Sequence, residues 1–148
     1  MYFEEIKLNT TIELAPVTIE EEKMLAFARL YDNIPLHTDE EYAKKTIFGK
    51  RIAPGVMTCM SVWAKYLEVD LFREELIAGI SAKMDWRKPV YADDVLTGTV
   101  RVTGKTQRSE KNGVVELTVT VRNQDGETVM THVTETVVKC KAEGERDE

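Results

Sequence analysis

The chain has 148 residues, the length of one ordinary domain that can bury a core without the help of disulfides or metals. Hydrophobic residues make up 43% and charged residues 31% of it, which is typical of a globular protein and excludes a disordered or membrane-spanning chain. The net charge of −6 gives no general basic surface. We therefore expect no nucleic acid among its partners, although a local basic patch can still meet an anionic ligand.

The N-terminal segment and the cysteines indicate where the protein works. The segment MYFEEIKLN is acidic where a secretory signal would be basic and then apolar, and no apolar stretch is long enough to cross a bilayer. We expect a cytoplasmic protein with no membrane partner. Cys59 and Cys140 lie far apart and belong to no metal-ligand pattern, so we expect two reduced cysteines and no metal site.

The first predicted elements are a strand and a helix. Residues 5–13 alternate apolar and polar side chains, a pattern typical of a half-buried strand. After it, Thr18 and Glu21 have the spacing of a capping box, and apolar residues then follow helical periodicity. This helix is expected to end near Tyr31.

Two further helices are predicted before residue 75. The segment DEEYAKK is expected to be a short helix, because Thr38 and Glu41 repeat the capping-box spacing. Residues 55–72 are apolar on nearly every side, which predicts a long helix buried almost all round.

The second half of the sequence is rich in predicted strands. Alternating patterns with β-branched residues predict four of them, at residues 76–86, 95–103, 114–122 and 128–139. Turns are expected at Asn112-Gly113 and at Asp125-Gly126. The order of elements predicts one α+β domain over residues 1–140, an antiparallel sheet of about five strands wrapped around a long central helix. Residues 141–148 are polar throughout, and we expect a disordered tail there.

The segment DNIPLHTDEEY is the first candidate for chemistry. Asp32 comes at the end of the predicted helix, where the free carbonyls disfavour a carboxylate by a few tenths of a kcal/mol. Pro35 favours an extended conformation at Ile34, which lets Asp32 and His37 turn toward one pocket. Each residue alone is more typical of an ordinary turn, which remains the alternative.

A second candidate is the segment FGKRIAPGVM at the start of the long helix. Unpaired N–H groups at a helix N-terminus can bind an oxyanion or polarise a carbonyl group, and Gly55 lies at this point. The alternative is that Pro54 and Gly55 only begin the helix.

Together these segments resemble a known family. The strings DNIPLHTD, FG and IAPG resemble Asp-x-Asn-Pro-x-His, Phe-Gly and Ile-Ala-His-Gly of the MaoC-like dehydratases, the (R)-specific enoyl-CoA hydratases of the hotdog fold. The string DWRKPVYADDVL is similar to the family's aromatic, Pro-Val and Gly-Asp segment, with Asp93 in place of the usual Gly. The resemblance implies a single hotdog domain.

The resemblance also implies roles for particular residues. Asp32 and His37 match the acid/base pair that holds the reacting water, and Gly55 matches the position whose N–H polarises the thioester carbonyl. Substrate-binding positions are expected at Ile34, which replaces the family's Asn, at Pro54, which replaces a frequent His, and at Arg87 and Lys88. The two basic residues can reach coenzyme A phosphates or an acidic acyl carrier protein.

The implied function is that of an (R)-specific enoyl-CoA hydratase, or 3-hydroxyacyl-thioester dehydratase, in fatty acid metabolism. Coenzyme A or acyl carrier protein is expected as part of the substrate, with no cofactor besides. A homodimer is expected, and a larger assembly is left open. Two alternatives stay open as well: a hotdog acyl-CoA thioesterase, and a hotdog protein that binds acyl thioesters without turning them over. The sequence does not give the length of the acyl chain.

Overall fold

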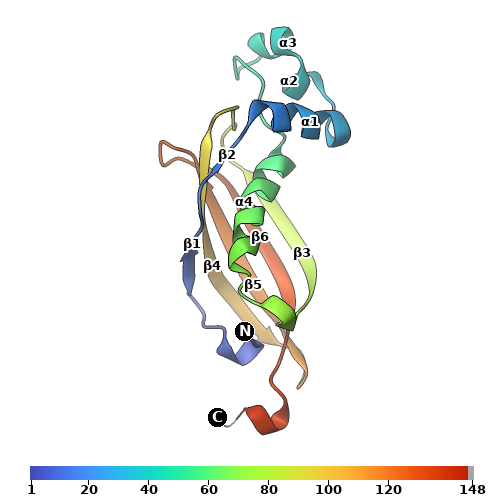
Figure 1. Cartoon of the computed structure of the whole chain (residues 1–148), viewed down its shortest axis with the longest axis vertical. Helices are drawn as coiled ribbons and strands as arrows, with labels where there is room; N and C mark the ends of the chain where they lie inside the picture. The colour runs from blue at the N-terminus through green and yellow to red at the C-terminus, as the bar shows by residue number, and fades with distance from the viewer. Residues whose placement is uncertain (147–148) are drawn as a thin grey trace.

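The computed structural model describes residues 1–146, in which a long helix, α4 (Gly55–Val69), lies along one face of an antiparallel sheet (Figure 1). Three shorter helices gather beyond the N-terminal end of α4, at the top of Figure 1. The expected α+β architecture, a sheet with one long central helix, is confirmed.

The sheet formed by the described residues has six strands, and every pairing is antiparallel. Their order is β1-β4-β5-β6-β3, and the short β2 also pairs with β4. The bounds are β1 (Thr11–Glu13), β2 (Val17–Thr18), β3 (Leu76–Trp86), β4 (Val95–Gln107), β5 (Asn112–Arg122) and β6 (Thr128–Lys139). The predicted bounds of β3 and β6 are confirmed, and β4 and β5 are longer than predicted.

Two expectations about the strands are wrong. The predicted strand at residues 5–13 is reduced to β1, because Phe3–Glu5 form a 3-10 turn (η1) and Asn9 has a left-handed φ of 67° that interrupts the extended backbone. Asn112-Gly113 does not form a turn: both residues already belong to β5, and the N–H groups of Arg108 and Ser109 donate to Asn112 O to close the hairpin. The turn at Asp125-Gly126 is confirmed, with Gly126 at φ 75°.

The three short helices form a cap at one end of the sheet. They are α1 (Glu21–Tyr31), α2 (Pro35–Thr38) and α3 (Glu40–Lys44). The predicted capping boxes are wrong, because Thr18 pairs with Val95 in the sheet and Glu20 precedes α1 instead. Asp39 caps α3, its carboxylate accepting the N–H of Tyr42 at 3.1 Å.

The core lies between α4 and the concave face of the sheet. Strand β5 alternates buried and half-buried residues, and its buried Leu117 and Val119 belong to the same core as Met57 and Val62 of α4. Each fully buried aliphatic side chain contributes about 1.5–3 kcal/mol to folding. The expectation that α4 is buried almost all round is wrong for one face, where a stripe of apolar side chains is exposed, namely Val56, Met60 and Leu67.

The end of the sheet opposite the cap carries both chain ends (Figure 1). The 3-10 turn η2 (Arg73–Glu75) precedes β3, and η3 (Glu143–Glu145) follows β6. Lys141 forms an ion pair with Glu5, and Arg146 forms one with Glu4. The expected disordered tail falls partly on residues 147–148, which lie outside the described residues. None of the helices within residues 1–146 is long and apolar enough to cross a membrane.

Candidate active site

The cap brings Asp32 and His37 into contact. Asp32 ends α1, where its N–H donates to Ala28 O, and Ile34 is extended, with φ −121° and ψ 152°, as expected before Pro35. Pro35 then begins α2, a single helical turn that carries His37 inward. The imidazole Nε2 lies 3.1 Å from Asp32 Oδ2, and His37 is only 5% exposed.

The hydrogen bonds of His37 assign different roles to its two ring nitrogens. Nδ1 lies 2.8 Å from Ile52 O, and since a carbonyl oxygen only accepts, Nδ1 must carry a proton and donate it. The contact between Nε2 and Asp32 Oδ2 is then attractive only if a proton lies on one of these two atoms. The geometry therefore lets the pair share one proton between these two atoms.

A pocket of about 430 Å³ joins this pair to the N-terminus of α4. Its walls include both members of the pair together with Gly55, Thr58 and Trp86. The N–H of Gly55 is at the first position of α4 and donates to no backbone carbonyl within residues 1–146. The positive end of the helix dipole adds to its attraction for a partly negative oxygen. An acid/base pair and a free N–H donor thus face one space.

The pocket contains most, but not all, of the predicted site residues. Asp32, His37, Gly55, Arg87 and Lys88 all line it. Ile34 and Pro54 do not: Ile34 is 44% exposed beside α2, and Pro54 is buried directly before α4. Substrate binding by these two residues stays a prediction.

The four basic residues near the pocket differ in their partners. Lys88 pairs with Glu127, and Arg51 pairs with Glu21. Lys50 lies 4.5 Å above the ring of Tyr91. The Arg87 side chain lines the pocket and forms no ion pair within the described part of the chain, so its charge is available to an anionic ligand.

The comparisons with known proteins agree with this geometry. The sequence profile described as "MaoC like domain" matches residues 5–124, most of the chain. The chain belongs to this family. Over 104 residues, 70% of either chain, it is 36% identical to the (R)-specific enoyl-CoA hydratase of Rhodospirillum rubrum.

Solved structures place the MaoC-like chain among hotdog proteins. The monoamine oxidase regulatory protein from Archaeoglobus fulgius is 35% identical, with a TM-score of 0.91 and 96% of each chain covered. The (R)-hydratase from A. caviae involved in PHA biosynthesis is 25% identical, with a TM-score of 0.73, and the alignment covers 93% of this chain and 99% of that one. The predicted family and the hotdog fold are therefore confirmed, as is membership of a family that is broadly one of hydratases and dehydratases.

One departure from the family pattern lies at a position with left-handed backbone conformation. Asp93, which replaces the usual Gly, has a left-handed φ of 70°. Asp tolerates this region better than most residues with a side chain. The carboxylate of the next residue, Asp94, accepts the Tyr91 N–H at 2.9 Å and so closes the same turn. The turn after β3 is thus formed without the glycine, and it carries Pro89 and Val90 into the pocket wall.

Several residues of the MaoC-like site were not assigned to it from the sequence. Ile52 positions His37 through its carbonyl oxygen, and Phe48 lines the pocket while its own carbonyl accepts the Tyr91 hydroxyl at 3.1 Å. Thr58, only 1% exposed, lies one helical turn after Gly55 on the same side of α4, a spacing that could have identified it. Trp86 was noted only as part of the family motif.

Two other groups of the MaoC-like chain are poor candidates for chemistry. Burial raises the pKa of the Cys59 thiol to about 11, so Cys59 is protonated near neutral pH and a weak nucleophile. Within residues 1–146, no three His, Cys, Asp or Glu side chains gather as they would around a metal ion.

Proposed function

We propose that the protein is an (R)-specific enoyl-CoA hydratase, or 3-hydroxyacyl-thioester dehydratase, that reversibly adds water to a trans-2-enoyl thioester. One observation carries the proposal: the hydrogen-bonded pair of His37 and Asp32 faces the same pocket as the free N–H of Gly55. The (R) configuration is taken from the names of the similar hydratases from R. rubrum and A. caviae.

Each part of the pocket has one task in this reaction. The thioester oxygen accepts the N–H of Gly55, which draws electrons from the double bond toward the carbonyl. The Asp32–His37 pair takes a proton from water while the hydroxyl oxygen forms its bond to C3. The electrons of the double bond move into an enolate, and the pair returns a proton to C2. Dehydration follows the same steps in reverse.

The N–H donor and the acid/base pair each lower the activation barrier of this reaction. Negative charge develops on the thioester oxygen, and one preorganised donor lowers such a barrier by about 3–4 kcal/mol. General acid–base catalysis contributes a further 10²- to 10⁴-fold in typical enzymes, or about 3–5 kcal/mol. A protein that only binds thioesters does not need an Asp–His pair and a free N–H donor facing one pocket. This argument favours the hydratase over the binding protein.

The carrier of the acyl group and the cellular location of the reaction are part of the same proposal. The free charge of Arg87 at the pocket wall suits the phosphate of coenzyme A or of an acyl carrier protein. The acyl carrier is part of the substrate, and the proposed reaction uses no other cofactor. We place the reaction in the fatty acid metabolism of the cytoplasm.

A homodimer is also part of the proposal. Strand β3 is at the edge of the sheet, and its exposed apolar residues include Ile77 and Ile80. The uncovered stripe of α4 adds Val56, Met60 and Leu67. A long edge strand with apolar side chains needs a cover, and a second copy can pair with it across a two-fold axis.

Sedimentation velocity tests the dimer. We expect a dimer for the unmodified protein and a monomer for Ile80→Glu, which places a charge on β3. Leu8→Glu is the matched control, because Leu8 is 54% exposed near the opposite edge of the sheet. A monomeric unmodified protein would overturn this part of the proposal.

The central experiment follows hydration of trans-2-enoyl-CoA substrates of several chain lengths by the loss of enoyl absorbance. Chiral analysis of the 3-hydroxyacyl product establishes its configuration. The control is the double variant Asp32→Asn/His37→Ala, which lacks the exchangeable proton. Hydration no faster than that of the control would refute the proposal, and release of free coenzyme A from saturated acyl-CoA would favour the thioesterase instead.

A further inference from the structure

Trp86 lies directly against the N-terminus of α4. A Cβ atom built on Gly55 would come within 2.4 Å of Trp86 Cε2 and 2.5 Å of its Nε1. The indole therefore occupies the space that a side chain at position 55 would fill. Gly55 is needed here for close packing as well as for its free N–H.

The contact limits how far the indole nitrogen lies from the Gly55 nitrogen. Adding two covalent bonds of about 1.5 Å to the 2.5 Å contact places Nε1 at most about 5.5 Å from Gly55 N. Two donors that each form a hydrogen bond of about 2.9 Å can share one acceptor when they are no more than about 5.8 Å apart. This separation allows one oxygen to lie within hydrogen-bond distance of both nitrogens.

The indole N–H is available for this contact. Trp86 is 50% exposed and lines the pocket, and its side chain donates to no acceptor within residues 1–146. An indole nitrogen only donates. The backbone on both sides of it is fixed, because Trp86 pairs with Met130 of β6 and the N–H of Arg87 donates to Val129 O at 2.8 Å.

We propose that Trp86 Nε1–H is a second hydrogen-bond donor to the thioester oxygen, beside the N–H of Gly55. The inference rests on the proposed hydratase function and adds a catalytic residue to it. A neutral donor that is already in place stabilises the enolate oxygen with little reorganisation as charge develops. It also leaves Asp32 and His37 free to handle water and protons.

The test removes the N–H and keeps the ring. Trp86→Phe keeps an aromatic wall, and Trp86→3-benzothienylalanine keeps the bicyclic shape while sulfur replaces the N–H group. Trp63→Phe is the matched control, because Trp63 is in α4, packs against Tyr66 and His132, and does not line the pocket. We expect both Trp86 variants to lose about 10- to 100-fold in kcat, and the control to stay within about threefold of the unmodified protein.

An infrared measurement distinguishes a hydrogen bond from the Trp86 indole from mere packing by its ring. In the Asp32→Asn/His37→Ala background, the carbonyl stretch of a bound, ¹³C-labelled crotonyl-CoA should move to higher frequency when Trp86 is replaced by 3-benzothienylalanine. An unchanged stretch and an unchanged kcat in that variant would show that the indole is only a wall. Absence of hydration by the unmodified protein would instead refute the hydratase proposal, so the two failures are distinguishable.

Discussion

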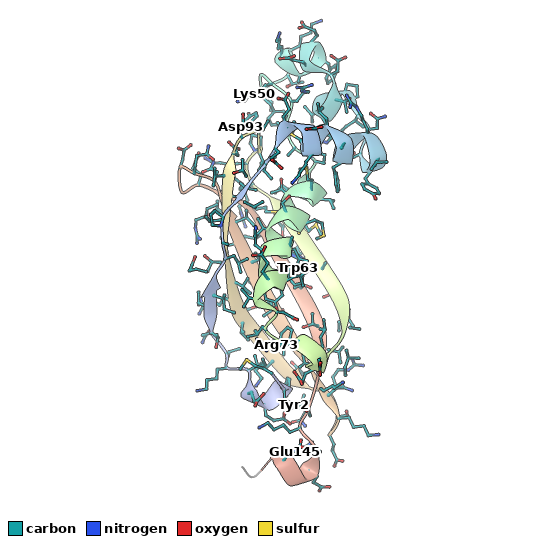
Figure 2. All side chains as sticks on the ribbon, viewed as in Figure 1. Tyr2, Lys50, Trp63, Arg73, Asp93 and Glu145 are labelled. Carbon is teal, nitrogen blue, oxygen red and sulfur yellow. The ribbon has the colours of Figure 1, made fainter. Side chains whose placement is uncertain are left out.

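Two glycines at opposite ends of the molecule each have an aromatic ring packed directly against their backbone. At the cap end, a Cβ on Gly55 would lie 2.4 Å from the Trp86 ring, and at the other end a Cβ on Gly113 would lie 2.4 Å from the Phe3 ring. Figure 2 shows the two ends, with Lys50 labelled near the cap and Tyr2, the neighbour of Phe3, near the chain ends. Phe3 is 7% exposed, whereas Trp86 is half exposed.

The polar groups around the two rings explain the difference. Around Phe3, the Lys105 ammonium lies 4.5 Å above the ring and also donates to Ile6 O. Around Trp86, the Gly55 N–H and the Arg87 guanidinium face a pocket and have no hydrogen-bond or ion-pair partner among residues 1–146. The same packing of ring on glycine therefore stabilises the fold at one end and leaves binding groups free at the other.

The largest effect is expected from the carboxylate at the cap end. Asp32→Asn should lower the hydration rate by about 10³-fold, because the pair with His37 loses the carboxylate that accepts and returns the proton. Since the Asp32 side chain is 45% exposed, the free energy of unfolding should change by less than about 1 kcal/mol. Initial rates and urea denaturation measure the two quantities. A variant with full activity would show that the pair is not the acid/base group.

The sequence revealed the polar half of this site better than the apolar half. Asp32, His37 and Gly55 belong to short sequence motifs, which can be matched to the corresponding motifs of a known family. Trp86 reaches Gly55 only because β3 ends beside the start of α4, 31 residues away in the chain, and periodicity within either element does not encode that contact. The strand prediction for residues 5–13 was wrong for a similar reason. The left-handed conformation of Asn9 interrupts the strand, and the alternation of apolar and polar residues does not reveal that conformation.

The next effect is expected at the opposite end, where the ring only packs. Phe3→Ala should lower the free energy of unfolding by about 3 kcal/mol, because it leaves a cavity beside Gly113. The kcat of the folded protein should stay within about twofold, since Phe3 is far from the pocket. Urea denaturation and enzyme assays on one preparation test both statements. A marked loss of kcat would mean that the two ends are coupled.

Adding a methyl group to each glycine compares the two ends directly. Gly113→Ala should cost about 2 kcal/mol of unfolding free energy, because the buried Phe3 ring has little room to move. Gly55→Ala should cost less than about 1 kcal/mol, because the half-exposed Trp86 ring can turn outward into the pocket.

The functional ranking of the glycine variants should be reversed. Gly55→Ala should lose most hydration activity as the indole moves, whereas Gly113→Ala should keep it. Equal losses of stability would show that exposure of the ring does not matter.

The smallest effect is expected between the two ends, at His132 of β6. This side chain is 4% exposed, its Nε2 has no hydrogen-bond partner among residues 1–146, and its ring packs edge-on against Trp63. Burial lowers the pKa of His132, so the folded protein holds it neutral. Its contribution to stability is fully present above the unfolded pKa of about 6.5, and is lost as the pH falls toward the lowered folded value.

His132→Leu should therefore leave the free energy of unfolding nearly unchanged at pH 8 and make it fall less steeply below pH 6.5. A single titrating group contributes a slope of at most about 1.4 kcal/mol per pH unit. Because His37 is the other histidine and is present in both proteins, the difference between their urea-denaturation curves across pH isolates His132. Parallel pH profiles would mean that His132 is not held neutral in the folded protein.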